Sequence, residues 1–118
     1  MARRITLYGI ANCDTVKRAR GWLEGRSIAY RFHDFKREGL AAGLADTWLA
    51  AAGAGRVINR KGTTWRKLTD AERAAADTIA GARALMMTQS SVVKRPVLDI
   101  DGGITVGFDA AAWEQLLP

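Results

Sequence analysis

The first forty residues change periodicity twice, and this order constrains the fold more than any other feature of the chain. Residues 5–10 form a short β-prone run, and the polar loop 12–15 follows it. Apolar residues then recur at helical spacing over 16–23. In residues 28–33 large apolar side chains fall on every second position, as in a half-buried strand. The order strand, helix, strand favours a parallel pair of strands.

The middle of the chain is helical in pattern. Residues 40–52 are rich in Ala and Leu and stop at Gly53. The basic segment 56–67 follows and predicts a loop with one embedded aromatic residue, Trp65. Thr69 and Glu72 then have the spacing of a capping box, which opens one or two Ala-rich helices that run to about residue 87. Gly81 argues against a single continuous helix there.

The last third is β-prone again. Residues 96–100 and 104–107 flank the turn sequence Asp101-Gly102-Gly103 and predict a hairpin. Asp109 is placed to cap a final helix. We therefore predict an α/β fold with the order β-α-β, a helical insertion over about residues 40–90, and β-β-α. We expect one domain, residues 1–118, because no linker or repeat interrupts it.

Charge and composition limit the function classes. The apolar fraction of 48% and the charged fraction of 25% are typical of a globular protein. The net charge of +6 favours anionic partners, but the cations are scattered, so nucleic acid is not the expected partner. No run approaches the ~20 apolar residues of a membrane-spanning helix. The first residues lack a signal-peptide pattern, so we expect a cytoplasmic protein without membrane association.

The chain has one cysteine, Cys13, and one histidine. An internal disulfide and a metal site rich in Cys or His are therefore excluded, and we expect no metal. Cys13 stands where the first strand gives way to the first helix, where backbone N–H groups and the helix dipole favour negative charge. A thiol there shifts toward the reactive thiolate. Lys17 would add to this effect and Asp14 would oppose it.

Any redox cycle of this chain must use one thiol. Dithiol enzymes resolve a mixed disulfide with a second cysteine, commonly in a Cys-x-x-Cys pair. Here that position holds Val16, so the second thiol must come from glutathione or from another protein. The alternative is that Cys13 is an inert buried residue, the commonest fate of a lone cysteine. Its position between strand and helix favours the reactive thiol.

Three segments together carry a family resemblance. Residues 8–15 with Lys17, residues 59–68 and residues 94–98 resemble the arsenate reductase (ArsC) and Spx superfamily, and most closely its YffB branch. The resemblance covers nearly the whole chain and implies a thioredoxin-like fold. It also implies a cis peptide bond between Arg95 and Pro96 beside the thiol, which an X-Pro bond permits.

The resemblance further implies an anion site. Cys13 and Thr15 match the nucleophile motif of the arsenate reductases, and Arg60 and Arg95 match two of their three oxyanion-binding arginines. The third arginine would fall within Val106-Gly107-Phe108, where this chain has no cation. Losing a charge-assisted contact of this kind costs about 1.5–3 kcal/mol. Arsenate reductase is therefore the third-ranked function.

We predict a monothiol oxidoreductase that uses Cys13, binds no cofactor, and takes glutathione as co-substrate. Arg60, Arg95 and Lys17 would hold the carboxylates of glutathione or of a small anionic or disulfide substrate. Asn12, Thr15 and Pro96 would shape the loop around the thiol. The second-ranked function is an Spx-like regulator that binds RNA polymerase without a dithiol switch. We expect a monomer.

Overall fold

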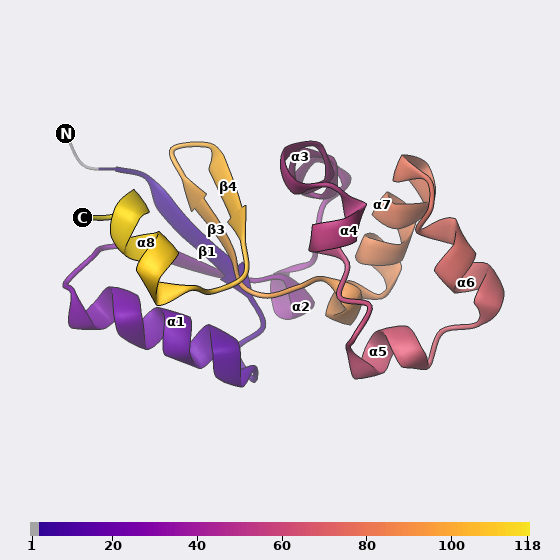
Figure 1. The fold of residues 1–118 in the computed structure, drawn as a ribbon, viewed down its shortest axis with the longest axis horizontal. Coiled ribbons are helices and arrows are strands. Elements are labelled where there is room, and N and C mark those ends of the chain that lie inside the picture. Colours follow the sequence, from indigo (N-terminus) through magenta and orange to yellow (C-terminus); the bar gives the residue numbers. More distant parts are fainter. Residues whose placement is uncertain (1–2) are drawn as a thin grey trace. The chain divides into compact units, whose positions relative to one another are not determined.

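The computed structural model describes residues 3–118 (Figure 1). The chain forms two compact units. The sheet unit consists of residues 3–34 and 95–118, and the helical unit consists of residues 35–94. Within residues 3–118, none of the helices has the length and apolar character needed to cross a bilayer.

The sheet unit is built on four strands. They are β1 (Ile5–Gly9), β2 (Arg31–Asp34), β3 (Val97–Ile100) and β4 (Gly103–Val106), in the order β2-β1-β3-β4. The first two strands pair in parallel, and β3 pairs with β1 and β4 antiparallel. The hairpin turn has positive φ at Asp101 (52°) and Gly102 (92°), which matches the right-handed twist of the flanking strands.

Two helices, α1 (Asp14–Gly25) and α8 (Ala110–Leu116), lie on one face of this sheet (Figure 1). Trp113 of α8 is fully buried and meets Trp22 and Phe108 edge to face, with ring centroids 5.7 and 4.8 Å away. Edge-to-face contacts add to the free energy gained from burial alone. The buried members of this core are Ile5, Leu7, Ala19, Leu23, Leu98, Trp113 and Leu117.

The helical unit contains six helices and a single 3-10 turn within residues 35–94. Their bounds are α2 Phe35–Glu38, α3 Ala42–Ala52, α4 Ala54–Val57, α5 Thr63–Arg66, α6 Asp70–Ala75, α7 Ile79–Thr88 and the 3-10 turn η1 Ser90–Val92. Phe35 and the fully buried Trp48 meet with ring centroids 6.0 Å apart, in a core that α3 and α7 share. An isolated β-bridge joins Ile58 to Val93.

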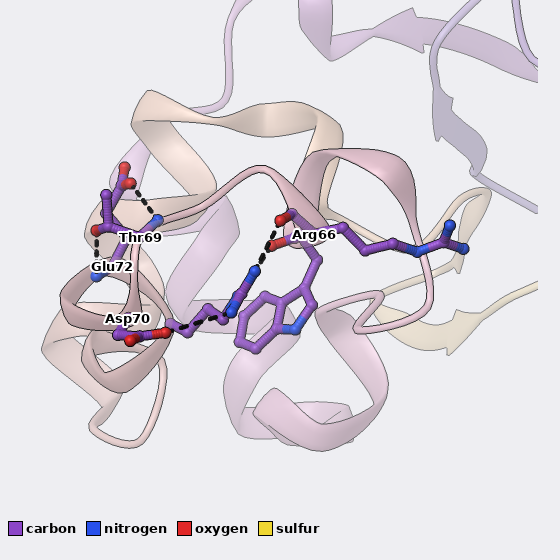
Figure 2. A network of polar contacts seen from close by, with 6 residues as sticks. Arg66, Thr69, Asp70 and Glu72 are labelled. Carbon is purple, nitrogen blue, oxygen red and sulfur yellow. Dashed lines mark hydrogen bonds and ion pairs between the residues drawn. The ribbon is translucent and has the colours of Figure 1, made fainter.

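The predicted element order is confirmed, including the parallel β-α-β start, the hairpin and the Asp109 cap. The capping box is also present, since Thr69 Oγ1 accepts from Glu72 N and Glu72 Oε1 accepts from Thr69 N (Figure 2). Arg73 then donates to the carbonyl groups of Trp65 and Arg66 at 3.2 and 2.7 Å, which ties α6 to α5.

One local prediction is wrong. The basic segment 56–67 is not a continuous loop, because the single-turn helix α5 forms inside it. The prediction that no single helix covers the stretch around Gly81 is confirmed, since α6 and α7 are separate helices, and Thr78 caps α7 by accepting from Gly81 N at 3.0 Å. A Cβ atom at Gly81 would overlap the carbonyl oxygen of Ala75, so the glycine serves this tight junction between α6 and α7.

Candidate functional site around Cys13

Cys13 is the N-cap residue of α1. Its backbone is extended (φ −129°, ψ 123°), and its carbonyl oxygen accepts the first helical hydrogen bond from Lys17 N at 2.9 Å. Cys13 is half-buried. The thiol therefore stands at the positive end of a helix of 12 residues.

The N-terminus of α1 lies next to the end of β1 because the helix packs closely against that strand. A Cβ atom at Gly9, the last residue of β1, would lie 2.8 Å from Cγ2 of Val16, which is closer than real Cβ contacts. Val16 is fully buried one turn after the thiol. The glycine lets the helix begin close above the strand end and fixes the short connection that carries Cys13.

The pKa of the Cys13 thiol is lowered from its ordinary value. Partial burial opposes this and is the largest single influence. It is outweighed by the backbone N–H of Val16, the hydrogen bond and charge of Arg95, and the backbone N–H of Thr15. The dominant influences include neither Lys17 nor Asp14, both of which are exposed.

Arg95 reaches the thiol from the segment before β3. Its side chain donates a hydrogen bond to the sulfur of Cys13 and is half-buried. The peptide bond between Arg95 and Pro96 is cis, as the family resemblance predicted. Pro96 is buried, and its carbonyl accepts from Gly107 N at 2.8 Å, so the segment is anchored to the residue after β4.

The other predicted residues divide between the two units. Asn12 is exposed in the loop before the thiol, and Lys17 is exposed in the first turns of α1. Thr15 is half-buried, and its hydroxyl accepts from the Arg18 guanidinium at 3.3 Å.

Arg60 belongs to the helical unit, so its membership of one site with Cys13 stays a prediction. Its guanidinium lies 5.2 Å from the ring centroid of Trp65.

The sequence reasoning missed one residue of this site. Asp34, the last residue of β2, is only 7% exposed, and its Oδ2 accepts a hydrogen bond from Ala11 N at 3.1 Å. A buried carboxylate needs such donors, and this one holds the loop two residues before Cys13. The signal was present in the sequence, because position 34 continues the alternation of positions 28, 30 and 32, which carry large apolar side chains and are half-buried in the structure.

A sequence model of the ArsC family matches residues 8–116, a span that includes the thiol loop, Arg60 and the cis Arg95–Pro96 bond. The chain belongs to the ArsC family. Its YffB-branch relationship is confirmed by a solved YffB protein, which is 44% identical, covers 97% of this chain and 99% of its own, and superposes with a TM-score of 0.91. The thioredoxin-like fold predicted for this ArsC-family chain is thereby confirmed as well.

Two further relatives agree over nearly the whole chain. An arsenate reductase (ArsC) related protein from Brucella melitensis is 50% identical, covers 95% of this chain and 92% of its own, and has a TM-score of 0.76. An uncharacterized protein from Haemophilus influenzae is 32% identical over 110 residues, which is 93% of this chain and 96% of that protein. This ArsC-family chain therefore matches its relatives from end to end.

Proposed function

We propose that this ArsC-family chain is a monothiol reductase in which Cys13 is the nucleophile and glutathione is the external thiol. The observation that carries the proposal is the half-buried Cys13 thiol at the N-terminus of α1, with its pKa lowered by Arg95 and by backbone N–H groups. Thiolates at helix N-termini beside a cation are typical of reactive cysteines, whereas structural cysteines are buried and inert.

The proposed cycle has two thiol–disulfide exchanges. The Cys13 thiolate attacks one sulfur of a mixed disulfide between the substrate and glutathione, and the substrate leaves as a thiolate that takes a proton from water. Cys13 is then disulfide-bonded to glutathione. A second glutathione thiolate attacks the glutathione sulfur of this disulfide, releases Cys13 as thiolate and leaves as oxidised glutathione. Across the two exchanges, the mixed disulfide and one reduced glutathione become the reduced substrate thiol and oxidised glutathione, so one disulfide bond is broken, one is formed and no further reductant is needed.

The side chains around the thiol have distinct proposed roles. Arg95 stabilises the Cys13 thiolate in the free protein and holds a carboxylate of the incoming glutathione. Lys17 and Arg60 are proposed to bind the remaining negatively charged group of glutathione. Asn12, Thr15 and Pro96 are proposed to shape the loop around the thiol. Asp34 holds this loop by accepting a hydrogen bond from Ala11 N. Glutathione is the main small thiol of the cytoplasm, the compartment expected from the sequence.

Arsenate is a weaker candidate substrate for this site. The third arginine of the oxyanion set would fall at the end of β4, where Val106 is buried and Gly107 has a positive φ of 90°. Neither residue has a cationic side chain, so the tetrahedral oxyanion would lose one of its charge-assisted contacts. We therefore propose a disulfide rather than arsenate as the oxidised substrate.

The direct test is the intact mass of the protein after exposure to oxidised glutathione. We expect the wild type to gain one glutathione, and the Cys13→Ser variant, which differs by one atom at the site, to gain none. Subsequent addition of reduced glutathione should remove the adduct. A wild-type protein that stays unmodified while small thiol reagents alkylate it would overturn glutathione as the partner. A thiol that resists both would overturn the enzyme proposal.

A further inference from the structure

A second concentration of positive charge lies wholly within the helical unit. A pocket of about 240 Å³ opens there, and four of its lining residues are cations: Arg56, Arg60, Lys61 and Lys94. Its lining contains no acidic residue and no cysteine. Across residues 3–118, no carboxylate forms a salt bridge with any of the four. Arg73 and Arg83 of the same unit, by contrast, each pair with an aspartate.

The floor of this pocket is held by backbone contacts. Asn59 N donates to the carbonyl of Val92 at 2.7 Å, and Lys94 N donates to the carbonyl of Val57 at 2.7 Å. Between them the bridge of Ile58 with Val93 joins two buried residues. Lys94 is thereby fixed beside the 56–61 segment, although the two are far apart in the chain.

The turn that carries Arg60 and Lys61 is also ordered. Asn59 Oδ1 accepts from Lys61 N at 3.1 Å, and the Lys61 carbonyl accepts from the Arg66 guanidinium at 2.8 Å. Gly62 closes the turn, with its N–H donated to the Asn59 carbonyl at 3.3 Å. Arg60 is held against the ring of Trp65. The cations therefore project from a scaffold fixed by hydrogen bonds rather than from a loose loop.

Four like charges around one cavity repel one another, and a bound anion relieves that repulsion. Guanidinium and ammonium groups bind phosphate oxygens through short charge-assisted hydrogen bonds. The volume is below the ~300–1,000 Å³ of pockets that enclose drug-sized ligands, so the occupant is small. We propose that this pocket binds a phosphate group, as the free anion or as part of a small phosphomonoester. The site needs no thiol and goes beyond the proposed reductase function.

The test uses the full chain with Cys13→Ser, so that it does not depend on thiol chemistry. Amide resonances are followed while potassium phosphate replaces potassium chloride at constant ionic strength and pH. We expect saturable shifts at Asn59, Lys61 and Lys94. The double variant Lys61→Gln with Lys94→Gln should weaken binding at least about tenfold, since it removes two charged donors. Arg60 is left unchanged because the proposed function also uses it.

Lys67→Gln is the matched control, since Lys67 is an exposed cation of the same unit that does not line the pocket. It should change phosphate affinity less than twofold, and thermal melts should show all variants folded. Amide shifts that do not saturate would mean an adventitious ion only and would overturn the site. The same conclusion would follow if Lys67→Gln weakened phosphate binding as much as the double variant does. A second titration with glycerol phosphate shows which form of phosphate the pocket prefers. Tighter binding than that of inorganic phosphate indicates a phosphomonoester, and equal or weaker binding indicates the free anion.

Discussion

The carboxylate of Asp34 and the backbone N–H of Ala11 are joined by a hydrogen bond of 3.1 Å that links the end of β2 to the loop before Cys13. The two residues are 23 positions apart in the chain. Because Asp34 is buried, the bond is partly shielded from water and contributes more than a fully exposed one would. The position of the thiol loop therefore depends on a strand that holds none of the residues first assigned to the site.

We expect Asp34→Ala to lower the free energy of unfolding by about 1–3 kcal/mol, because Ala11 N loses its acceptor and a buried cavity is left. The Cys13 alkylation rate at neutral pH should change as well, since the loop is no longer fixed. Asp34→Asn is the matched variant, because it retains an acceptor oxygen. It should recover the alkylation profile. Equal profiles in the wild type and Asp34→Ala would show that the bond does not position the thiol.

Arg95→Gln should raise the pKa of Cys13 toward its ordinary value, because the variant removes the charge of Arg95 and its hydrogen bond to the sulfur. Iodoacetamide alkylation measured across pH gives this pKa directly. Arg95→Lys keeps the charge but loses the planar fork, so its pKa should fall between those of the wild type and Arg95→Gln. An unchanged pH profile in Arg95→Gln would contradict the stabilising role of this guanidinium.

The lowered pKa also predicts how stability depends on pH. A thiol whose pKa is lower in the folded state stabilises the fold fully above its unfolded pKa of about 8.5. The contribution is lost as the pH falls through the lower, folded-state pKa. Denaturant unfolding of the wild type and Cys13→Ser should therefore show a stability difference that grows with pH across this window. A difference that is flat with pH would mean that the pKa is the same in both states.

Gly9→Ala should destabilise the protein by about 1–3 kcal/mol, because the new methyl group overlaps Val16 and forces α1 away from β1. Gly21→Ala is the control, since a Cβ atom there meets no atom within 4 Å and the residue is exposed inside α1. It should stabilise the helix by about 0.5–1 kcal/mol. Combining Gly9→Ala with Val16→Ala should cost less than the sum of the single variants, as a double-mutant cycle by chemical denaturation would show.

The sequence predicted the elements whose signals are local. The alternation over residues 28–33, the capping box at Thr69 and the turn at Asp101 each depend on neighbours within a few residues. The capping box and the turn are confirmed, and the strand forms over Arg31–Asp34, three residues later than the alternation begins. Gly81 argued against one continuous helix, and the structure divides this stretch into α6 and α7. The break itself lies just before Gly81, where Thr78 caps α7 by accepting from the Gly81 N–H, so the glycine indicated a break nearby but not its position.

The contacts of the site were harder to predict because they are long-range. The strand-to-helix position of Cys13 follows from the order of the elements, but the hydrogen bond from Arg95 depends on where β3 inserts next to β1. The role of Asp34 depends on the same kind of pairing, that of β2 with β1. The contact of the Arg60 guanidinium with the Trp65 ring depends on the turn that Asn59 organises.

Val16 stands where a dithiol enzyme has its second cysteine, and it is a fully buried residue of α1 that packs closely against Gly9. Its aliphatic side chain supplies no second thiol, so a disulfide formed at Cys13 is not resolved within the chain. The proposed turnover consequently depends on the surrounding pool of reduced thiol and slows as that pool is oxidised. The packing of one aliphatic side chain thus couples the output of the protein to the redox state of its environment.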